Sequence, residues 1–245
     1  MHDDLASIRV DYDGDGFSAA DAGADPMATF LAWFGDARGR DTVAEANAMT
    51  LATATADGVP SARMVLLKAV DPVRTSFTWY TNLRSRKAME AATTGVAALC
   101  WWWPGSPGRQ VRAVGRVEEV DVNTSRSYFD GRPRDARIGA VASRQSRAVA
   151  DRATLDARAA ELEGVEPELP ETWGGLTLTA DELEFWQGRA GRLHDRITFL
   201  RLDEDGGIRS SAAVVAAGGA DALRAAGSVV TDAHGARWLR ARLEP

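Results

Sequence analysis

The segment Phe185–Arg196, with the sequence FWQGRAGRLHDR, holds the densest group of side chains that could do chemistry. If it is an extended strand, Arg192, His194 and Arg196 lie on one face at two-residue spacing. Cationic and hydrogen-bonding side chains on one face repel one another unless an anion or an electron-rich ligand lies between them. Two aromatic residues open the segment. The segment therefore predicts a binding site for a flat, anionic ligand. The alternative interpretation is a solvated strand face that carries one histidine by chance.

A second basic group follows a pair of hydroxyl side chains. Tyr80 and Thr81 end a predicted strand, and Arg84, Arg86 and Lys87 come where that strand passes into a predicted helix. Hydroxyls, cations and the free backbone N–H groups of a helix start are a favourable set of phosphate donors. The alternative interpretation is a solvated basic turn of helix.

A third group, Tyr128, Arg132 and Arg134, again combines an aromatic side chain with cations. Two separated anion-binding groups predict two phosphorylated ligands, or a cofactor and a substrate. Arg63 and Lys68 lie five residues apart on another predicted strand. An odd spacing places them on opposite faces unless a bulge intervenes, so they need not serve the same part of a ligand.

Rare residue types point to the same segments. Of the 29 basic residues only two, Lys68 and Lys87, are lysine. Arginine and lysine are not interchangeable at a phosphate or ring-edge contact, so the retained lysines indicate a site, although chance retention is the alternative. The three glutamines are Gln110, Gln145 and Gln187. Their amides suit the hydrogen-bonding edge of a heterocycle.

Composition excludes several classes of protein. The chain has 245 residues, 45% of them hydrophobic and 26% charged, which is typical of a soluble globular protein. A net charge of −6 argues against non-specific nucleic-acid binding. One cysteine gives no disulfide framework, and one cysteine with three histidines argues against a metal centre. We find no signal peptide and no apolar run of membrane-spanning length, so a cytoplasmic protein is expected.

The pattern of strands predicts an antiparallel fold. Residues 1–25 have little periodicity and are expected to form a mobile N-terminal arm, and a helix begins at Asp25-Pro26. Strands are predicted over residues 48–55, 61–70, 77–81, 96–103, 109–120, 175–179, 182–186, 192–202 and 238–243. Further helices are predicted over residues 84–92, 121–129, 147–162 and 220–226, with a loop at 131–137. Short turns between the early strands favour a closed or partly closed barrel with helices outside, and no Gly-rich phosphate loop is present.

The order of these segments resembles that of the pyridoxamine 5′-phosphate oxidase family, whose members are FMN-dependent enzymes. Matching segments run from about Ile8 to Leu202 and resume at Trp238–Pro245, in the family's order and spacing. They are RMVLLK (63–68), YTNLRSRKA (80–88), RQV (109–111), YFDGRPRDARIGA (128–140), SRQS (143–146), WGG (173–175), EFWQG (184–188) and RLHDR (192–196).

The resemblance implies a fold, a dimer and a set of site residues. The fold would be mainly β with flanking helices, an antiparallel split β-barrel spanning 26–245 as a single domain, with an insertion at about 203–237. FMN would lie at the interface of a homodimer. By match, it would be bound by Arg63, Lys68, Tyr80, Thr81, Arg86, Lys87, Gln110, Gln145, Ser146, Trp186 and Arg196. A phosphorylated B6 vitamer would be bound by Lys68, Tyr128, Arg132, Arg192 and His194, with Arg9 and Tyr12 of the arm closing over it.

The implied reaction is oxidation of pyridoxamine or pyridoxine 5′-phosphate to pyridoxal 5′-phosphate, with O2 as acceptor and H2O2 as by-product. Arg192 and His194 would be the catalytic residues. The chain departs from the family pattern at Ala136, where a serine that contacts the substrate phosphate is usual, and at Val10, Val141 and Glu244. These departures leave open a relative with a different, phenazine-type substrate. A non-catalytic flavin- or vitamer-binding protein is the contrasting class.

Overall fold

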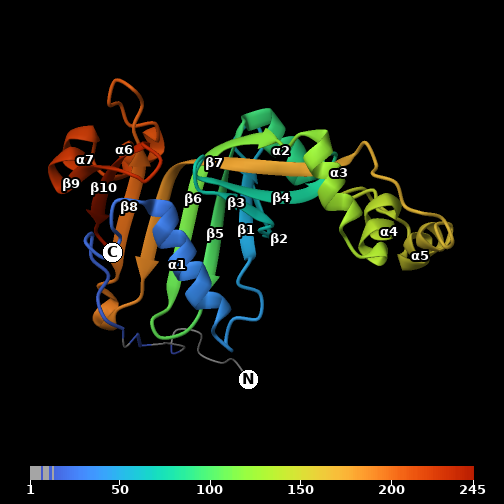
Figure 1. The fold of residues 1–245 in the computed structure, drawn as a ribbon, viewed down its shortest axis with the longest axis horizontal. Coiled ribbons are helices and arrows are strands. Elements are labelled where there is room, and N and C mark those ends of the chain that lie inside the picture. The colour runs from blue at the N-terminus through green and yellow to red at the C-terminus, as the bar shows by residue number, and fades with distance from the viewer. Residues whose placement is uncertain (1–6, 8–10, 13) are drawn as a thin grey trace. The chain divides into compact units, whose positions relative to one another are not determined.

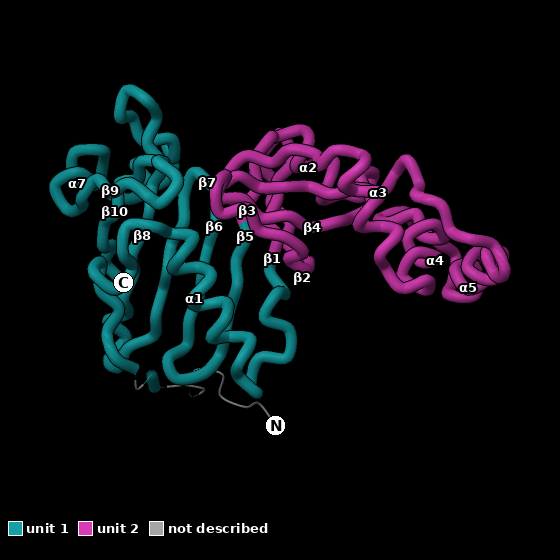
Figure 2. Tube along the Cα trace, viewed as in Figure 1, with its two compact units in different colours: residues 1–49, 99–114, 180–245 teal, residues 50–98, 115–179 magenta. Residues whose placement is uncertain are grey.

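The computed structural model describes residues 7, 11, 12 and 14–245, which fall into two compact units (Figures 1 and 2). Unit 1 comprises residues 1–49, 99–114 and 180–245, and unit 2 comprises residues 50–98 and 115–179. Strands β1 (Ala48–Ala54), β5 (Val96–Trp103), β6 (Arg109–Glu119) and β7 (Trp173–Gln187) contribute residues to both units.

Unit 2 is built around β4 (Ser76–Asn82). This strand pairs antiparallel with β3 (Ala69–Asp71) and with the first half of β7, in a register that sets Tyr80 opposite Gly175 and Asn82 opposite Trp173. The unit also holds β2 (Pro60–Leu66). Its helices are α2 (Arg86–Thr94), α3 (Val122–Asp130), α4 (Arg134–Ala142) and α5 (Arg152–Ala160).

In unit 1 the second half of β7 pairs antiparallel with β8 (Asp195–Arg201), which pairs with β10 (Arg237–Leu243) and through it with β9 (Gly227–Thr231). Helix α1 (Pro26–Arg38) packs Phe30 against Trp101. The short helices α6 (Ser211–Ala216) and α7 (Ala220–Ala226) lie within residues 203–237, and Leu223 of α7 packs with Leu200 and Leu239.

Local sequence explains where several helices begin. The Asp25 carboxylate accepts hydrogen bonds from the Met27 and Ala28 N–H groups, and Pro26 occupies the first turn of α1. The Asp121 carboxylate caps α3 in the same way. These helix starts, the helix over 220–226 and the antiparallel pairing are confirmed. No described helix has the length and apolar character needed to cross a bilayer.

Six predicted elements are wrong in their bounds. The strand over 61–70 is two strands, because the chain leaves β2 at Leu66 and enters β3 at Ala69. The strands over 175–179 and 182–186 are one continuous β7, and the loop at 131–137 already contains the start of α4. The helix over 147–162 is only α5, because Asp151 caps it at Thr154. The strand over 192–202 begins only at Asp195.

That last correction removes the proposed one-face arrangement of Arg192, His194 and Arg196. Residues Ala190–Arg192 form a 3-10 turn in which Gly191 has φ 66° and Arg192 has φ 62°. A left-handed residue interrupts an extended strand, so side chains no longer alternate across it. Of the three, only Arg196 lies on β8. The single domain over 26–245, the insertion and the mobility of residues 1–25 stay predictions.

Candidate active site

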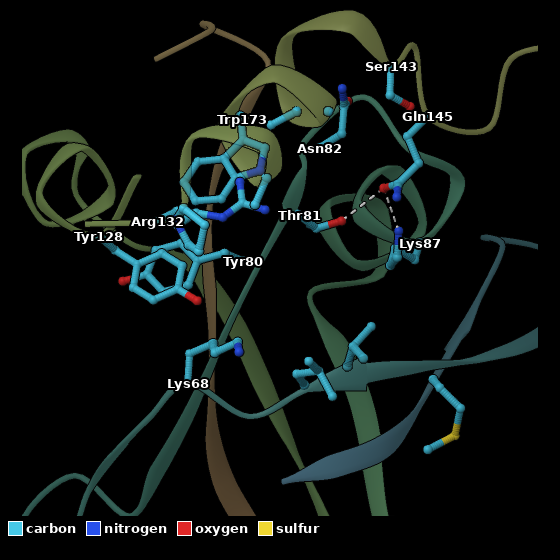
Figure 3. Close-up of a pocket in the computed structure, with 17 residues that line it drawn as sticks. Lys68, Tyr80, Thr81, Asn82, Lys87, Tyr128, Arg132, Ser143, Gln145 and Trp173 are labelled. Atoms are coloured by element: carbon cyan, nitrogen blue, oxygen red, sulfur yellow. Dashed lines mark hydrogen bonds between the residues drawn. The ribbon is translucent and has the colours of Figure 1, made fainter. Parts of the chain in front are cut away.

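A cavity of about 590 Å³ lies within unit 2, in the size range of small-molecule sites (Figure 3). Its described lining contains three cations, Lys68, Lys87 and Arg132, and no carboxylate. The three positive charges repel one another unless an anion lies between them. Both of the chain's lysines therefore line one cavity, as their retention predicted. The lining includes seven of the predicted site residues: Lys68, Tyr80, Thr81, Lys87, Tyr128, Arg132 and Gln145.

Lys87 occupies one side of this cavity, at the first turn of α2 (Figure 3). Its Nζ donates to Gln145 Oε1 at 2.7 Å and to Ser85 Oγ at 3.2 Å, and both partners are neutral. Thr81 Oγ1 donates to the same Gln145 oxygen at 3.1 Å. Burial, and then the charge of Arg63, lower the pKa of Lys87 from 10.5 to about 8. A buried ammonium without a carboxylate suits an anionic ligand.

The lowered pKa of Lys87 predicts how binding of the expected cofactor, FMN, depends on pH. In the cofactor-free protein Lys87 loses its proton as pH rises through about 8. We therefore expect FMN affinity to be highest below pH 8 and to fall above it, because the phosphate then meets a neutral amine or must bind together with a proton. Fluorescence titration of the cofactor-free protein with FMN from pH 6.5 to 9.5 measures this. A flat profile across that range would contradict it.

Glu90 is the buried anchor of the neighbouring cations. Its carboxylate accepts hydrogen bonds from Thr53 Oγ1 at 2.5 Å, Ser61 Oγ at 2.6 Å and Arg86 Nε at 2.7 Å. Arg63 Nη2 lies 3.6 Å from it. Burial raises the pKa of Glu90, but these hydrogen bonds and the Arg86 charge outweigh burial and lower it to about 2. Glu90 therefore stays ionised and holds two predicted cofactor residues.

Arg63 and Arg86 are held in place by residues that do not line the cavity. Arg63 Nη1 also donates to the Leu51 carbonyl at 3.0 Å and to Thr53 Oγ1 at 2.6 Å. The backbone N–H of Arg86 donates to Ser146 Oγ at 3.1 Å, which brings another predicted cofactor residue to the start of α2. The i, i+4 spacing of Arg86 and Glu90 is the signal in the sequence that indicates this ion pair.

Replacing Glu90 with glutamine should weaken binding of the expected cofactor, FMN, about tenfold. Glutamine fits the same space but leaves two arginines without their counter-charge, and a hydrogen bond to a charged group is worth about 1.5–3 kcal/mol. FMN dissociation constants and thermal melting give the measurement. Arg74→Gln, which breaks an exposed pair with Glu118, is the matched control and should change neither. FMN affinity equal to wild type in Glu90→Gln would contradict this role.

On the other side of the cavity three aromatic rings lie nearly parallel (Figure 3). Tyr80 stacks on Tyr128 with centroids 3.9 Å apart at 10°, and on Trp173 with centroids 5.3 Å apart at 11°. A Cβ on Gly175 would lie 2.8 Å from the Tyr80 ring, so glycine is needed there for this approach. The Arg132 guanidinium lies 4.9 Å from the Trp173 ring. Trp173 had not been predicted as a site residue.

Unit 1 holds a second group of predicted residues. Tyr12, Trp186 and His194 form an aromatic cluster with centroids 4.6–5.9 Å apart. The Arg189 N–H donates to His194 Nδ1 at 3.1 Å, so the neutral tautomer carries its proton on Nε2. Burial, and then the charge of Arg192, lower the pKa of His194 below 6.5, which favours this neutral form at pH 7.

The remaining predicted residues of unit 1 have other surroundings. Arg196 Nη2 pairs with buried Glu184 at 2.8 Å and Nη1 donates to the Glu244 carbonyl at 2.8 Å, so its charge is compensated within the chain. Gln110 lies on β6, and Arg192 lies in the turn before β8. Arg9 lies outside the described residues. Glu184, which forms the ion pair with Arg196, was also not predicted from the sequence.

Structural comparison defines the class. PhzG from Burkholderia lata 383, solved with tetrahydrophenazine-1-carboxylic acid, aligns with a TM-score of 0.72 at 26% identity, over 95% of this chain and 99% of that one. A pyridoxamine 5′-phosphate oxidase-related, FMN-binding protein from Nostoc punctiforme PCC 73102 aligns at 0.58 and 16% identity, over 74% and 92%, and supports the fold alone. The fold is the FMN-binding split barrel, which confirms the predicted fold class.

Sequence comparison narrows the class to one family. Residues 36–166 match the family model described as pyridoxamine 5′-phosphate oxidase, and residues 173–245 match its C-terminal dimerisation region. Pyridoxine/pyridoxamine 5′-phosphate oxidases from Pseudomonas entomophila L48 and Janthinobacterium sp. Marseille are 45% and 47% identical, over 83% and 82% of this chain and 95% of each relative. The chain belongs to the pyridoxamine 5′-phosphate oxidase family of FMN oxidoreductases, and FMN is its cofactor.

The residues of unit 2 fit that cofactor. Lys87 supplies a buried ammonium whose hydrogen-bond partners, Gln145 and Ser85, are both neutral, so it can meet a phosphate. The Ser85 side chain does not cap α2, and of the first N–H groups that of Arg86 donates to Ser146 Oγ. Gln145 lies beside Lys87 with amide groups suited to a heterocycle edge. Arg63 and Arg86, held by Glu90, add positive charge close by.

Proposed function

We propose that this chain is a cytoplasmic, homodimeric pyridoxine/pyridoxamine 5′-phosphate oxidase. The substrate's exocyclic CH2–OH or CH2–NH2 carbon is oxidised to the aldehyde of pyridoxal 5′-phosphate. O2 takes up the two electrons and two protons as H2O2, and the amine substrate also consumes water and releases ammonia. When bound, FMN supplies the hydride acceptor for this oxidation.

One observation supports the proposal most strongly: a cavity with three cations, no carboxylate among its described lining residues and an aromatic stack. The Lys87 side matches a phosphate of the cofactor. Lys68, Tyr128 and Arg132 match a second, smaller phosphorylated ring. Two anionic ligands would compensate the charge of both cationic groups, whereas a single ligand would leave one group without a counter-charge.

Within this proposal the chain's residues bind and orient the substrate. Arg132 and Lys68 hold its phosphate, and the Tyr128 hydroxyl can donate to the same group. Ala136 lines this cavity without offering a hydroxyl. In the proposed homodimer, in which both chains line each site, Arg192 and His194 serve the reacting end of the substrate. Neutral His194 keeps a proton on Nε2, and the Arg189 N–H holds the position of its ring. Tyr12 closes the aromatic cluster around His194.

Purified protein loaded with FMN tests the proposal. We expect O2 uptake, H2O2 and pyridoxal 5′-phosphate in equal amounts with either phosphorylated vitamer. The structural match to PhzG and the alanine at position 136 favour a second candidate, a reduced tricyclic carboxylic acid as substrate. Oxidation of such a compound without any turnover of the B6 vitamers would establish that second candidate. FMN binding with no O2 uptake on either substrate class would indicate a binding protein.

A further inference from the structure

Arg132 is a half-buried cation that pairs with no carboxylate among the described residues. Its Nη1 is inaccessible to solvent and has no hydrogen-bond partner among the described residues. Burial lowers the pKa of its guanidinium, with Tyr128 acting in the opposite direction. Its backbone is fixed, since Arg132 N–H donates to the Phe129 carbonyl at 3.1 Å and Pro133 begins α4 directly afterwards. Arg132 also lines the cavity, so an anionic ligand there can supply the missing counter-charge.

Trp173 is the group that the Arg132 guanidinium does contact. The distance from the guanidinium carbon to the ring centroid is 4.9 Å. The indole is itself immobilised, because it stacks on Tyr80 at 5.3 Å and meets the Phe129 ring edge-on at 5.2 Å. Its exposure is 7%. Residues of α3, β4 and β7 thus fix one flat surface beneath the cation.

An aromatic face and a carboxylate hold an arginine in different ways. A carboxylate fixes the guanidinium but neutralises its charge and occupies its donors, as Asp36 does for Arg109 at 2.7 Å. An aromatic face attracts the cation through its quadrupole, defines the guanidinium plane and leaves the N–H donors at the edge free. For capture of a phosphate the second arrangement keeps both charge and donors available.

We propose that Trp173 is a positioning residue that presents Arg132 to the substrate phosphate and so makes the site selective for phosphorylated over unphosphorylated vitamers. This proposal rests on the proposed function for the identity of the ligand. It adds that selectivity for the phosphate depends on an aromatic side chain which does not itself bind the phosphate. Lys68 lies on the other side of the aromatic stack from Trp173 (Figure 3). It adds positive charge to the cavity, but no described contact places it on an aromatic ring.

The test compares Trp173→Leu and Trp173→Phe in FMN-loaded protein. For Trp173→Leu we expect KM and Kd for pyridoxine 5′-phosphate to rise about tenfold, from the strength of a desolvated cation–π contact, with kcat within about twofold. Affinity for unphosphorylated pyridoxine should not change. Trp173→Phe keeps a smaller aromatic face and should therefore lose less affinity for pyridoxine 5′-phosphate than Trp173→Leu. It also provides the test if the leucine variant does not fold.

Trp33→Leu and Trp33→Phe are the matched controls, because Arg109 lies 4.5 Å from the Trp33 ring but outside the cavity and already pairs with Asp36. These variants should leave phosphate selectivity unchanged. Equal loss of affinity for both forms of the vitamer, or unchanged selectivity in the Trp173 variants, would overturn the proposal. Binding of pyridoxine 5′-phosphate is measured without turnover, so an inactive wild type would refute the proposed function and still allow the role of Trp173 to be decided.

Discussion

Replacing Lys87 with methionine is expected to raise the dissociation constant of FMN by about 10- to 100-fold. The side chain keeps its length and its apolar stem but loses the buried ammonium, and a hydrogen bond to a charged group is worth about 1.5–3 kcal/mol. Removal of an uncompensated buried cation should at the same time stabilise the cofactor-free protein, because the desolvation that lowers the Lys87 pKa is no longer required. Fluorescence titration and thermal melting of the cofactor-free protein measure the two effects.

Two controls accompany this variant. Arg152→Met removes an exposed cation of α5 that pairs with Asp156 and does not line the cavity, and it should leave FMN affinity within about twofold of wild type. The decline of affinity above pH 8 should be absent in Lys87→Met, because the group that titrates there has been removed. An unchanged dissociation constant in Lys87→Met would place the cofactor phosphate elsewhere.

Arg192→Ala is expected to lower kcat/KM by about 10- to 100-fold while leaving FMN bound. The expected loss corresponds to one charge-assisted contact with the substrate, about 1.5–3 kcal/mol. Arg192 lies in the turn before β8 in unit 1 and is not among the residues that line the unit 2 cavity. Steady-state kinetics and the flavin absorbance of the purified protein distinguish the two effects.

Backbone conformation requires a companion variant. Arg192 has φ 62°, a region that alanine rarely adopts and glycine adopts freely. Arg192→Gly removes the same side chain without that strain, so both variants should lose activity to a similar extent. Recovery of activity in Arg192→Gly would show that the turn, and not the guanidinium, matters. Equal loss of FMN in the Arg192 and Lys87 variants would mean that the two ligands have been assigned to the wrong groups.

Residue type and local spacing were sufficient for several features of this protein. Both lysines line the cavity, and Tyr128 and Arg132 join them there. Residue type alone was enough for this, because lysine and arginine are not interchangeable at a phosphate contact. Asp25 and Asp121 predicted helix starts, since a cap is a contact between residues two or three apart.

Spacing failed where the backbone left its regular path. The pattern Arg192, His194, Arg196 suggested one strand face, but a left-handed turn at Gly191 and Arg192 delays β8 until Asp195. Arginine gives no local signal for positive φ, so the alternation could not have been rejected from the sequence. The repulsion expected among these cations is also absent at Arg196, because Glu184 compensates it.

By itself the sequence determined the chemistry: the family, an anion-binding cavity lined by the chain's two lysines, and an antiparallel fold with helices capped at local signals. Only the tertiary structure decided which side chains hold the binding groups in place. The β4–β7 register brings Trp173 next to Tyr80 and under Arg132, and the fold brings Thr53 and Ser61 to Glu90. Such contacts join residues far apart in the chain, and their geometry depends on strand register and packing, which residue spacing within one element does not encode.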